Sequence, residues 1–97
     1  MPKAIWNGAV IAEAPLSDIV SLEGNVYFPE GAVDKSFLKA SDKQTICAWK
    51  GTASYYDLEV AGKTNAAAAW YYAEPKSAAA NIRGRIAFWK GVEVTSS

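Results

Sequence analysis

The segment KQTICAWKGTASYYDLEV, residues 43–60, decides the class of fold. Its second half alternates in a period of two, which is typical of a β-strand with one wetted face. One side of this strand would carry Tyr56, Leu58 and Val60, and the other Tyr55, Asp57 and Glu59. Residues 43–49 are typical of a second strand, and Lys50-Gly51 of a tight turn. The segment therefore predicts two strands joined by a turn.

Two further hairpins are predicted before this segment. Asn7-Gly8 stands between two apolar runs, and this dipeptide tolerates the two positive φ angles of a type I′ turn. Because both faces of this hairpin would carry apolar residues, we expect both to be covered. Pairing across its turn places Ile5 opposite Val10 and Trp6 opposite Ala9. The runs 19–22 and 26–29, around turn residues 23–25, predict the second hairpin, in which Pro29 ends the strand or lies on a sheet edge.

The rest of the chain predicts mostly short elements. The spacing of apolar residues over 31–40 predicts a two-turn helix with a face of Ala32, Val33, Phe37, Leu38 and Ala40. Four alanines favour helix over 66–72, but the following Trp70-Tyr71-Tyr72 favours strand, which we prefer. Residues 75–80 predict one helical turn, and residues 86–89 and 92–94 a last strand pair. The pattern predicts a single mainly β domain over residues 1–97, a small antiparallel two-sheet sandwich or tent-like half-barrel.

Composition excludes several classes of function. The chain has 97 residues, 10 basic and 10 acidic side chains, no histidine and one cysteine. Zero net charge gives no electrostatic reason to expect a nucleic-acid or acidic-membrane partner. Without histidine the chain cannot build a catalytic triad or the usual zinc site, and one cysteine cannot form an internal disulfide. The N-terminal stretch lacks the basic and apolar regions of a signal peptide, and no segment is long enough to span a membrane, which predicts a cytoplasmic protein. We also expect no bound cofactor and no metal.

Tryptophans recur two residues before a glycine at predicted turns. The three sites are Trp6-Asn7-Gly8, Trp49-Lys50-Gly51 and Trp89-Lys90-Gly91. The last two lie in segments 46–51 and 86–91, which are similar enough to suggest a duplicated hairpin unit. Each ring would fill the end of a thin sandwich, or the rings of Trp6, Trp49, Trp89 and Trp70 would together line a cleft for a planar or cationic ligand.

Other polar and reactive side chains admit both structural and functional interpretations. Asp57 and Glu59 share one strand face, which could hold Mg²⁺ for nucleotidyl transfer or merely be solvated. Cys47 near Lys50 could be a nucleophile or a small buried apolar residue. Lys50-Gly51 could bind an anion or form an ordinary turn.

Arg83 and Arg85 would point to the same side of a strand and could meet a ligand carboxylate or Glu74. Tyr71 and Tyr72 would lie on opposite faces of a strand.

The chain resembles the family catalogued as domain of unknown function 427. The resemblance covers nearly the whole chain and rests on the order and spacing of Tyr27-Phe28-Pro29, Thr45-x-Cys47-x-x-Lys50-Gly51, Tyr55 or Tyr56, Ala69-Trp70, Pro75 and Ile86-Ala87-Phe88. It implies a mostly β single domain, common in bacteria, with a tent of two sheets and no established activity. Some catalogues attach a nucleotidyltransferase label to the family. The chain departs from the family pattern at Ala48, where members often have proline.

We expect a non-enzymatic module that binds a small planar or anionic ligand, or a peptide, in an aromatic-walled pocket. Its candidate binding residues are Trp6, Tyr27, Trp49, Lys50, Gly51, Trp70, Tyr71, Arg83, Arg85 and Trp89. The first alternative is an enzyme, with Mg²⁺ held by Asp57 and Glu59 or with Cys47 as nucleophile. The second alternative is a structural module that works as a homo-oligomer.

Overall fold

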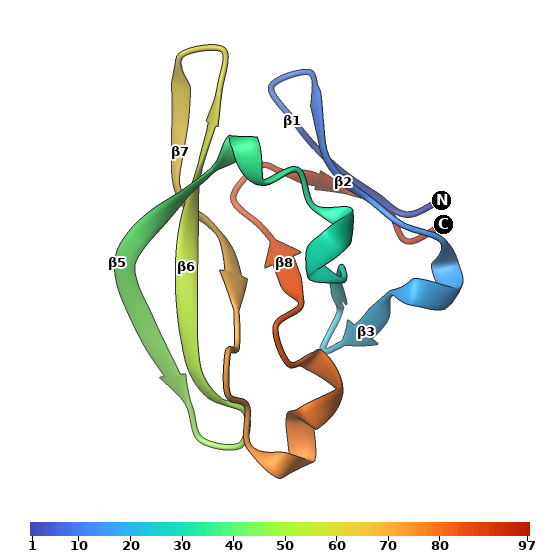
Figure 1. The fold of residues 1–97 in the computed structure, drawn as a ribbon, viewed down its shortest axis with the longest axis vertical. Helices are drawn as coiled ribbons and strands as arrows, with labels where there is room; N and C mark the ends of the chain where they lie inside the picture. Colours follow the sequence, from blue (N-terminus) through green and yellow to red (C-terminus); the bar gives the residue numbers. More distant parts are fainter.

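Strands dominate the computed structural model, which describes residues 1–97 (Figure 1). Its nine strands are β1 (Lys3–Trp6), β2 (Ala9–Glu13), β3 (Val20–Leu22), β4 (Asn25–Tyr27), β5 (Leu38–Cys47), β6 (Gly51–Val60), β7 (Lys63–Tyr71), β8 (Ile86–Phe88) and β9 (Glu93–Val94). Four 3-10 helices lie between them: η1 (Leu16–Asp18), η2 (Glu30–Ala32), η3 (Lys35–Phe37) and η4 (Ser77–Ile82). The predicted mainly β fold with short helical turns is therefore confirmed. No helix of the chain is both long and apolar enough to cross a membrane.

The strands form three antiparallel sheets, ordered β2-β1-β9, β3-β4 and β5-β6-β7-β8. In the last sheet β5 and β6 pair across the predicted turn, with Cys47 opposite Gly51. Phe28, just after β4, exchanges two backbone hydrogen bonds with Ile86 of β8, at 2.8 and 2.9 Å. These bonds join the β3-β4 hairpin to the free edge of β8, so that the four-stranded sheet continues into it.

The two faces of the four-stranded sheet pack against different elements. Neighbouring residues of a strand point to opposite faces, so Ala69 and Trp70 of β7 belong to different cores. Ala69 faces the larger core, which the β1-β2 hairpin covers with Ala4, Ile11 and Ala12. Trp70 faces a smaller core that contains Tyr27 of β4 and Ala79 and Ile82 of η4. The β3-β4 hairpin and η4 thus enclose the second face, where the candidate site lies.

The first two hairpins match their predicted turns. Ile5 pairs with Val10 and Trp6 with Ala9, and the φ angles of Asn7 and Gly8 are 49° and 78°, as a type I′ turn requires. Glu23-Gly24 joins β3 to β4 with a similar pair of positive φ angles. The expectation that both faces of the first hairpin are covered was wrong at Val10, which is 47% exposed. Val10 lies on β2, at the edge of its sheet, while its neighbour Ile11 points into the core.

The predicted helix over 31–40 is absent. The chain instead forms η2 and η3 and then enters β5 at Leu38. Asp34 caps the start of η3 by accepting a hydrogen bond from the Ser36 amide. From Leu38 onward the backbone pairs with β6, beginning opposite Leu58. A two-turn helix is marginal alone, and pairing with a ten-residue strand supplies more hydrogen bonds.

The predicted last strand pair was wrong in its partners. β8 pairs with β7, whereas β9 leaves that sheet and pairs with β1, with Val94 opposite Ala4. Lys90-Gly91 has the positive φ angles of a hairpin turn, but it connects two sheets. Segments 46–51 and 86–91 are therefore not equivalent hairpin units, since only the first turns back into its own sheet. The pairing of β9 with β1 also brings the two termini close together, as Figure 1 shows.

The ambiguous run over 66–72 is a strand, as we preferred, as far as Tyr71, and Tyr72 forms an isolated bridge with Arg83. β7 contains one irregularity, where the register against β6 shifts between Tyr56 and Leu58. Ala67 lies in this bulge with a φ of 54°, in the left-handed region that non-glycine residues rarely adopt. The bulge redirects the backbone groups of Ala67, and these groups help to build the candidate site.

Candidate functional site

A pocket of about 280 Å³ opens on the second face of the four-stranded sheet. Four aromatic side chains form most of its wall, together with one amide and one ammonium group. The lining residues are Asn25, Lys50, Tyr55, Trp70, Tyr72 and Trp89. They come from β4, the β5-β6 turn, β6, β7 and the segments after β7 and β8. Residues separated by up to 64 positions in the sequence (25 to 89) therefore meet in one hollow.

Strand register places the aromatic rings next to one another. Tyr55 of β6 is opposite Trp70 of β7, and Trp70 is opposite Ala87 of β8, so their side chains share a face. Trp89 follows two residues after Ala87 and returns to that face. The ring centroids of Trp70 and Trp89 are 5.9 Å apart at an interplanar angle of 78°, and those of Tyr55 and Trp89 are 6.5 Å apart. These are favourable aromatic contacts, which hold the wall in one arrangement.

Both indole N–H groups of the wall are bonded within the protein. Trp70 Nε1 donates to the hydroxyl of Tyr27 at 3.2 Å, and Trp89 Nε1 donates to the backbone carbonyl of Ala67 at 2.6 Å. The two bonds fix the orientation of the indoles. The tryptophans therefore offer ring surface to a ligand rather than hydrogen-bond donors.

The β7 bulge positions Trp89. Its residue Ala67 donates its amide hydrogen to a carboxylate oxygen of Asp57 at 2.7 Å, while its carbonyl accepts from Trp89. Asn65 also donates to the carbonyl of Lys90 at 2.8 Å, and the Lys90 ammonium donates to the carbonyl of Ala66 at 3.2 Å. The chain of contacts from Asp57 through Ala67 makes Asp57 a positioning residue for the pocket wall.

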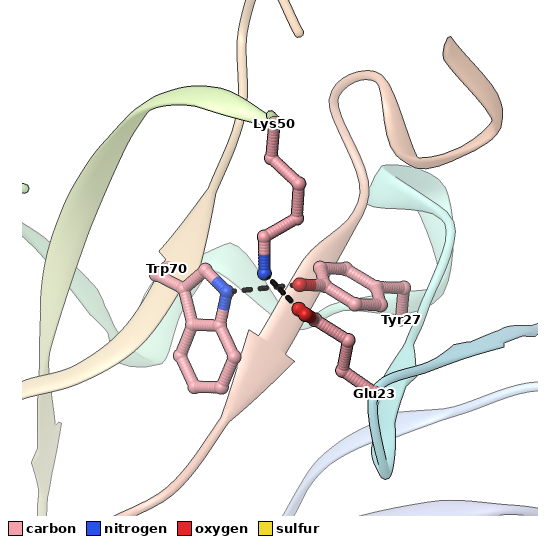
Figure 2. Close-up of polar contacts among 4 residues, drawn as sticks. All are labelled: Glu23, Tyr27, Lys50 and Trp70. Atoms are coloured by element: carbon pink, nitrogen blue, oxygen red, sulfur yellow. Dashed lines mark hydrogen bonds and ion pairs between the residues drawn. The ribbon is translucent and has the colours of Figure 1, made fainter. Parts of the chain in front are cut away.

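An ion pair closes one end of the pocket. Lys50 comes from the β5-β6 turn and bonds to the carboxylate of Glu23 in the β3-β4 turn. Figure 2 shows the Lys50 side chain extending toward Glu23 between Trp70 and Tyr27. Lys50 is only 8% exposed, and its ammonium lies 5.5 Å from the ring centroid of Tyr72. The pair links the two hairpins at opposite edges of the curled sheet.

The titratable groups around this ion pair keep their usual charge states at neutral pH. The hydrogen bond from Lys50 lowers the pKa of Glu23. Burial alone would lower the pKa of Lys50, but the hydrogen bond to Glu23 and the neighbouring charges leave that pKa raised. Burial raises the pKa of the Tyr27 and Tyr72 hydroxyls. The pocket thus contains a charged lysine, which is a poor nucleophile, and neutral tyrosines.

Several sequence-predicted binding residues lie outside the pocket. Trp6 packs against the larger core, and Tyr71 stacks on Tyr56 on the opposite sheet face, with ring centroids 4.9 Å apart. Trp49 is exposed in the β5-β6 turn and does not line the pocket.

Gly51 lines a separate hollow of about 410 Å³ whose other residues are Gln44, Thr52, Ser54, Ala73, Glu74 and Lys76. Of the ten predicted binding residues, Lys50, Trp70 and Trp89 line the aromatic pocket, and Tyr27 lies directly behind Trp70.

The two arginines and the cysteine do not reach the pocket wall. Arg83 and Arg85 are not in a strand, because Arg83 ends η4 and the backbone turns before β8. Arg85 donates to the backbone carbonyls of Asn81 and Asp18, at 3.1 and 2.6 Å, and forms no ion pair with Glu74. Cys47 is a half-buried free thiol at the end of β5.

Asp57 and Glu59 do not converge on one point. The Asp57 carboxylate is engaged with the Ala67 amide, while Glu59 is exposed on β6 opposite Thr64. No group of three or more cysteine, aspartate or glutamate side chains in the chain is arranged to hold a metal ion. The geometry therefore assigns Asp57 a structural bond and gives no direct support to its pairing with Glu59 at a metal.

Sequence reasoning missed three of the six lining residues: Asn25, Tyr55 and Tyr72. Tyr55 was placed on the wetted face of β6, and that face becomes the pocket wall because Trp70 pairs beside it. For Tyr72, the sequence predicts only that its side chain and that of Tyr71 lie on opposite faces of a strand. The partner of Lys50 was also missed, because nothing local marks Glu23 as more than a turn residue.

The fold and the pocket define a small mainly β domain with a hollow lined largely by aromatic side chains. A sequence model of the family described as Domain of unknown function (DUF427) matches residues 3–96. The chain therefore belongs to this family, as its motifs indicated. No curated protein matches the sequence.

Proposed function

We propose that the domain is a binding module for a small planar molecule, which lies against the aromatic wall of the pocket. The observation that carries this proposal is the convergence of four aromatic rings, from Tyr55, Trp70, Tyr72 and Trp89, on one open hollow. A planar ligand gains favourable stacked or edge contacts with such rings. Pockets of this kind, with apolar walls and few polar groups, are the usual form of small-molecule sites.

The polar groups of the wall limit how the ligand is held. Both indole N–H groups are already bonded, and Lys50 is bonded to Glu23. The amide of Asn25 makes no side-chain hydrogen bond within the chain, so it is free to donate to and accept from a ligand. Most of the binding energy would therefore come from ring contacts, with polar contacts that set orientation.

The volume restricts the ligand's size. A pocket of about 280 Å³ is slightly smaller than most small-molecule sites, which measure roughly 300–1,000 Å³. It suits a compound of about one or two fused rings better than a dinucleotide or a folded peptide. Trp89 is 42% exposed, so part of the aromatic wall lies at the protein surface.

Native mass spectrometry of the protein from the cells that produce it naturally tests the proposal. We expect a non-covalent mass excess in the wild type and its loss in Trp89→Leu. Trp49→Leu is the matched control, since Trp49 is exposed to a similar degree but lies outside the pocket. A wild-type mass equal to that of the bare chain, or an excess that persists in folded Trp89→Leu, would contradict the proposal.

A further inference from the structure

The rim of the aromatic pocket carries ammonium groups that have no carboxylate partners. Lys43 Nζ lies 5.0 Å from the ring centroid of Tyr55 and 5.4 Å from that of Trp89. Lys90 Nζ lies 5.3 Å from the ring centroid of Trp89. The three ion pairs of the structure involve Lys3, Lys35 and Lys50, so neither rim lysine is neutralised.

A bulge in β5 brings Lys43 to this position. The ladder pairs Ala40 with Tyr56 and resumes with Gln44 opposite Ser54, so residues 41–43 stand across from the single residue Tyr55. Bulges of this type redirect a side chain. Here the redirected side chain is Lys43, whose ammonium lies over two rings of the pocket wall.

The charge at the pocket is therefore locally positive although the chain as a whole is neutral. Lys43, Lys50 and Lys90 contribute three ammonium groups, against the carboxylate of Glu23, which is bonded to Lys50, and that of Asp57, which holds the Ala67 amide. A cationic ligand would enter against this field, and Lys43 already occupies the ring faces at the rim that attract cations. An anionic group would be attracted by the same field.

We propose that the pocket selects planar aromatic ligands that carry an anionic group such as a carboxylate, with the ring against the aromatic wall and the anionic group facing Lys43. This inference rests on the proposed function, because it specifies the ligand class of the same pocket. Lys43 acts as a specificity-determining residue, and the field of Lys50 and Lys90 adds to it. The Asn25 amide is free to hold a neutral polar atom of the ring.

Three probes that share one ring system separate the contribution of charge to the binding affinity from that of ring stacking. They are the anion 2-naphthoate, neutral 2-naphthamide and the cation 2-naphthylmethylammonium. Tryptophan fluorescence titrations at low salt give their dissociation constants. We expect the wild type to bind 2-naphthoate about tenfold more tightly than 2-naphthamide, and the cation most weakly. Raising the salt concentration should reduce the preference, because the attraction is partly exposed to solvent.

Lys43→Gln tests the assigned residue. We expect it to weaken 2-naphthoate about threefold while leaving 2-naphthamide unchanged, as the loss of one partly exposed charge contact predicts. Lys63→Gln removes the same charge at the far end of β7 and should change neither affinity. If 2-naphthamide or the cation binds as tightly as 2-naphthoate, or if Lys43→Gln keeps the full preference, the inference is wrong while the proposed function stands. Failure of all three probes to bind would instead contradict the proposed function.

Discussion

At the scale of single residues, the two partners of the Lys50–Glu23 ion pair differ in their access to water. Lys50 is nearly buried, while the Glu23 side chain is 46% exposed. An unpaired charge is costly where water cannot reach it and cheap where it can. Losing the carboxylate should therefore harm the fold more than losing the ammonium.

Glu23→Gln and Lys50→Met test this asymmetry. Glu23→Gln leaves the buried ammonium without its counter-charge, so we expect the larger loss of unfolding free energy. Lys50→Met keeps a side chain of similar length and leaves a carboxylate that water can solvate, so its loss should be about 1 kcal/mol or less. Chemical denaturation of both variants measures the difference, and equal losses, or a larger loss in Lys50→Met, would contradict it.

The same ion pair predicts how stability depends on pH. The pKa of Glu23 is lowered in the folded chain, so its contribution is complete above the ordinary value of 4.5 and is lost as the pH falls through the folded pKa. The pKa of Lys50 is raised, so its contribution is complete below the ordinary value of 10.5 and is lost as the pH rises through the folded pKa. The pKa of Asp34 is also lowered, by its hydrogen bonds from Ser36, which adds a second acid-sensitive contribution.

Thermal unfolding across acid pH should show this dependence. We expect the wild type to lose stability below about pH 4.5, and Glu23→Gln to lose less over the same interval because the Glu23 contribution is gone while that of Asp34 remains. Identical acid profiles for the two proteins would show that Glu23 does not titrate with a lowered pKa.

Tyr27 provides the hydroxyl that accepts the indole hydrogen of Trp70 inside the smaller core. Tyr27→Phe removes this acceptor, and no water can replace it without entering the core. We expect a loss of about 1–3 kcal/mol in unfolding free energy, which is typical of a buried donor left unpaired. Chemical denaturation measures the loss, and a variant as stable as the wild type would show that the bond contributes nothing.

At the scale of elements, the contacts of the β7 bulge favour the structural interpretation of Asp57 over the catalytic one. The Asp57 carboxylate holds the Ala67 amide, and the Ala67 carbonyl holds the Trp89 indole. Loss of the carboxylate should therefore loosen both the strand and the pocket wall.

Three substitutions on β6 test this role. Asp57→Ala should cost about 1.5–3 kcal/mol, as the loss of a hydrogen bond to a charged group predicts, and should shift the Trp89 indole N–H resonance. Asp57→Asn keeps an acceptor oxygen, so most of the stability should remain. Glu59→Ala alters an exposed residue and should stay within about 0.5 kcal/mol of the wild type. Unchanged stability in Asp57→Ala would contradict the structural role that we assign to this carboxylate.

The elements that sequence could predict are those specified by local chemistry. Asn7-Gly8 determines its turn and register through backbone conformation, and the alternation over 52–60 determines β6. Residues 31–40 were predicted wrongly because their apolar spacing suits a helix, while the chain forms two short 3-10 turns and then, from Leu38, a strand that depends on pairing with β6. The pairing of β9 with β1 also depends on a distant partner, and nothing near Lys90-Gly91 indicates it.

At the scale of the whole molecule, the pocket depends on the curled sheet. β5 bows around the sheet in Figure 1, and the β3-β4 hairpin continues it beyond β8. The sequence singled out Trp70 and Trp89 among the candidate binding residues, and both line the hollow described above. It could not show that Trp6 belongs to another sheet or that Tyr55 stands beside Trp70, because both facts follow from strand order and register.

The most direct test of a planar ligand in this pocket is a titration of the four tryptophan indole N–H resonances by two-dimensional NMR, with 2-naphthoate as the probe. Trp70 and Trp89 line the pocket, whereas Trp6 packs in the other core, so the protein contains its own control. We predict saturable shifts of the Trp70 and Trp89 resonances with little change at Trp6. Equal shifts at Trp6, or no saturable shift at Trp70 and Trp89, would contradict the assignment of the pocket as the binding site.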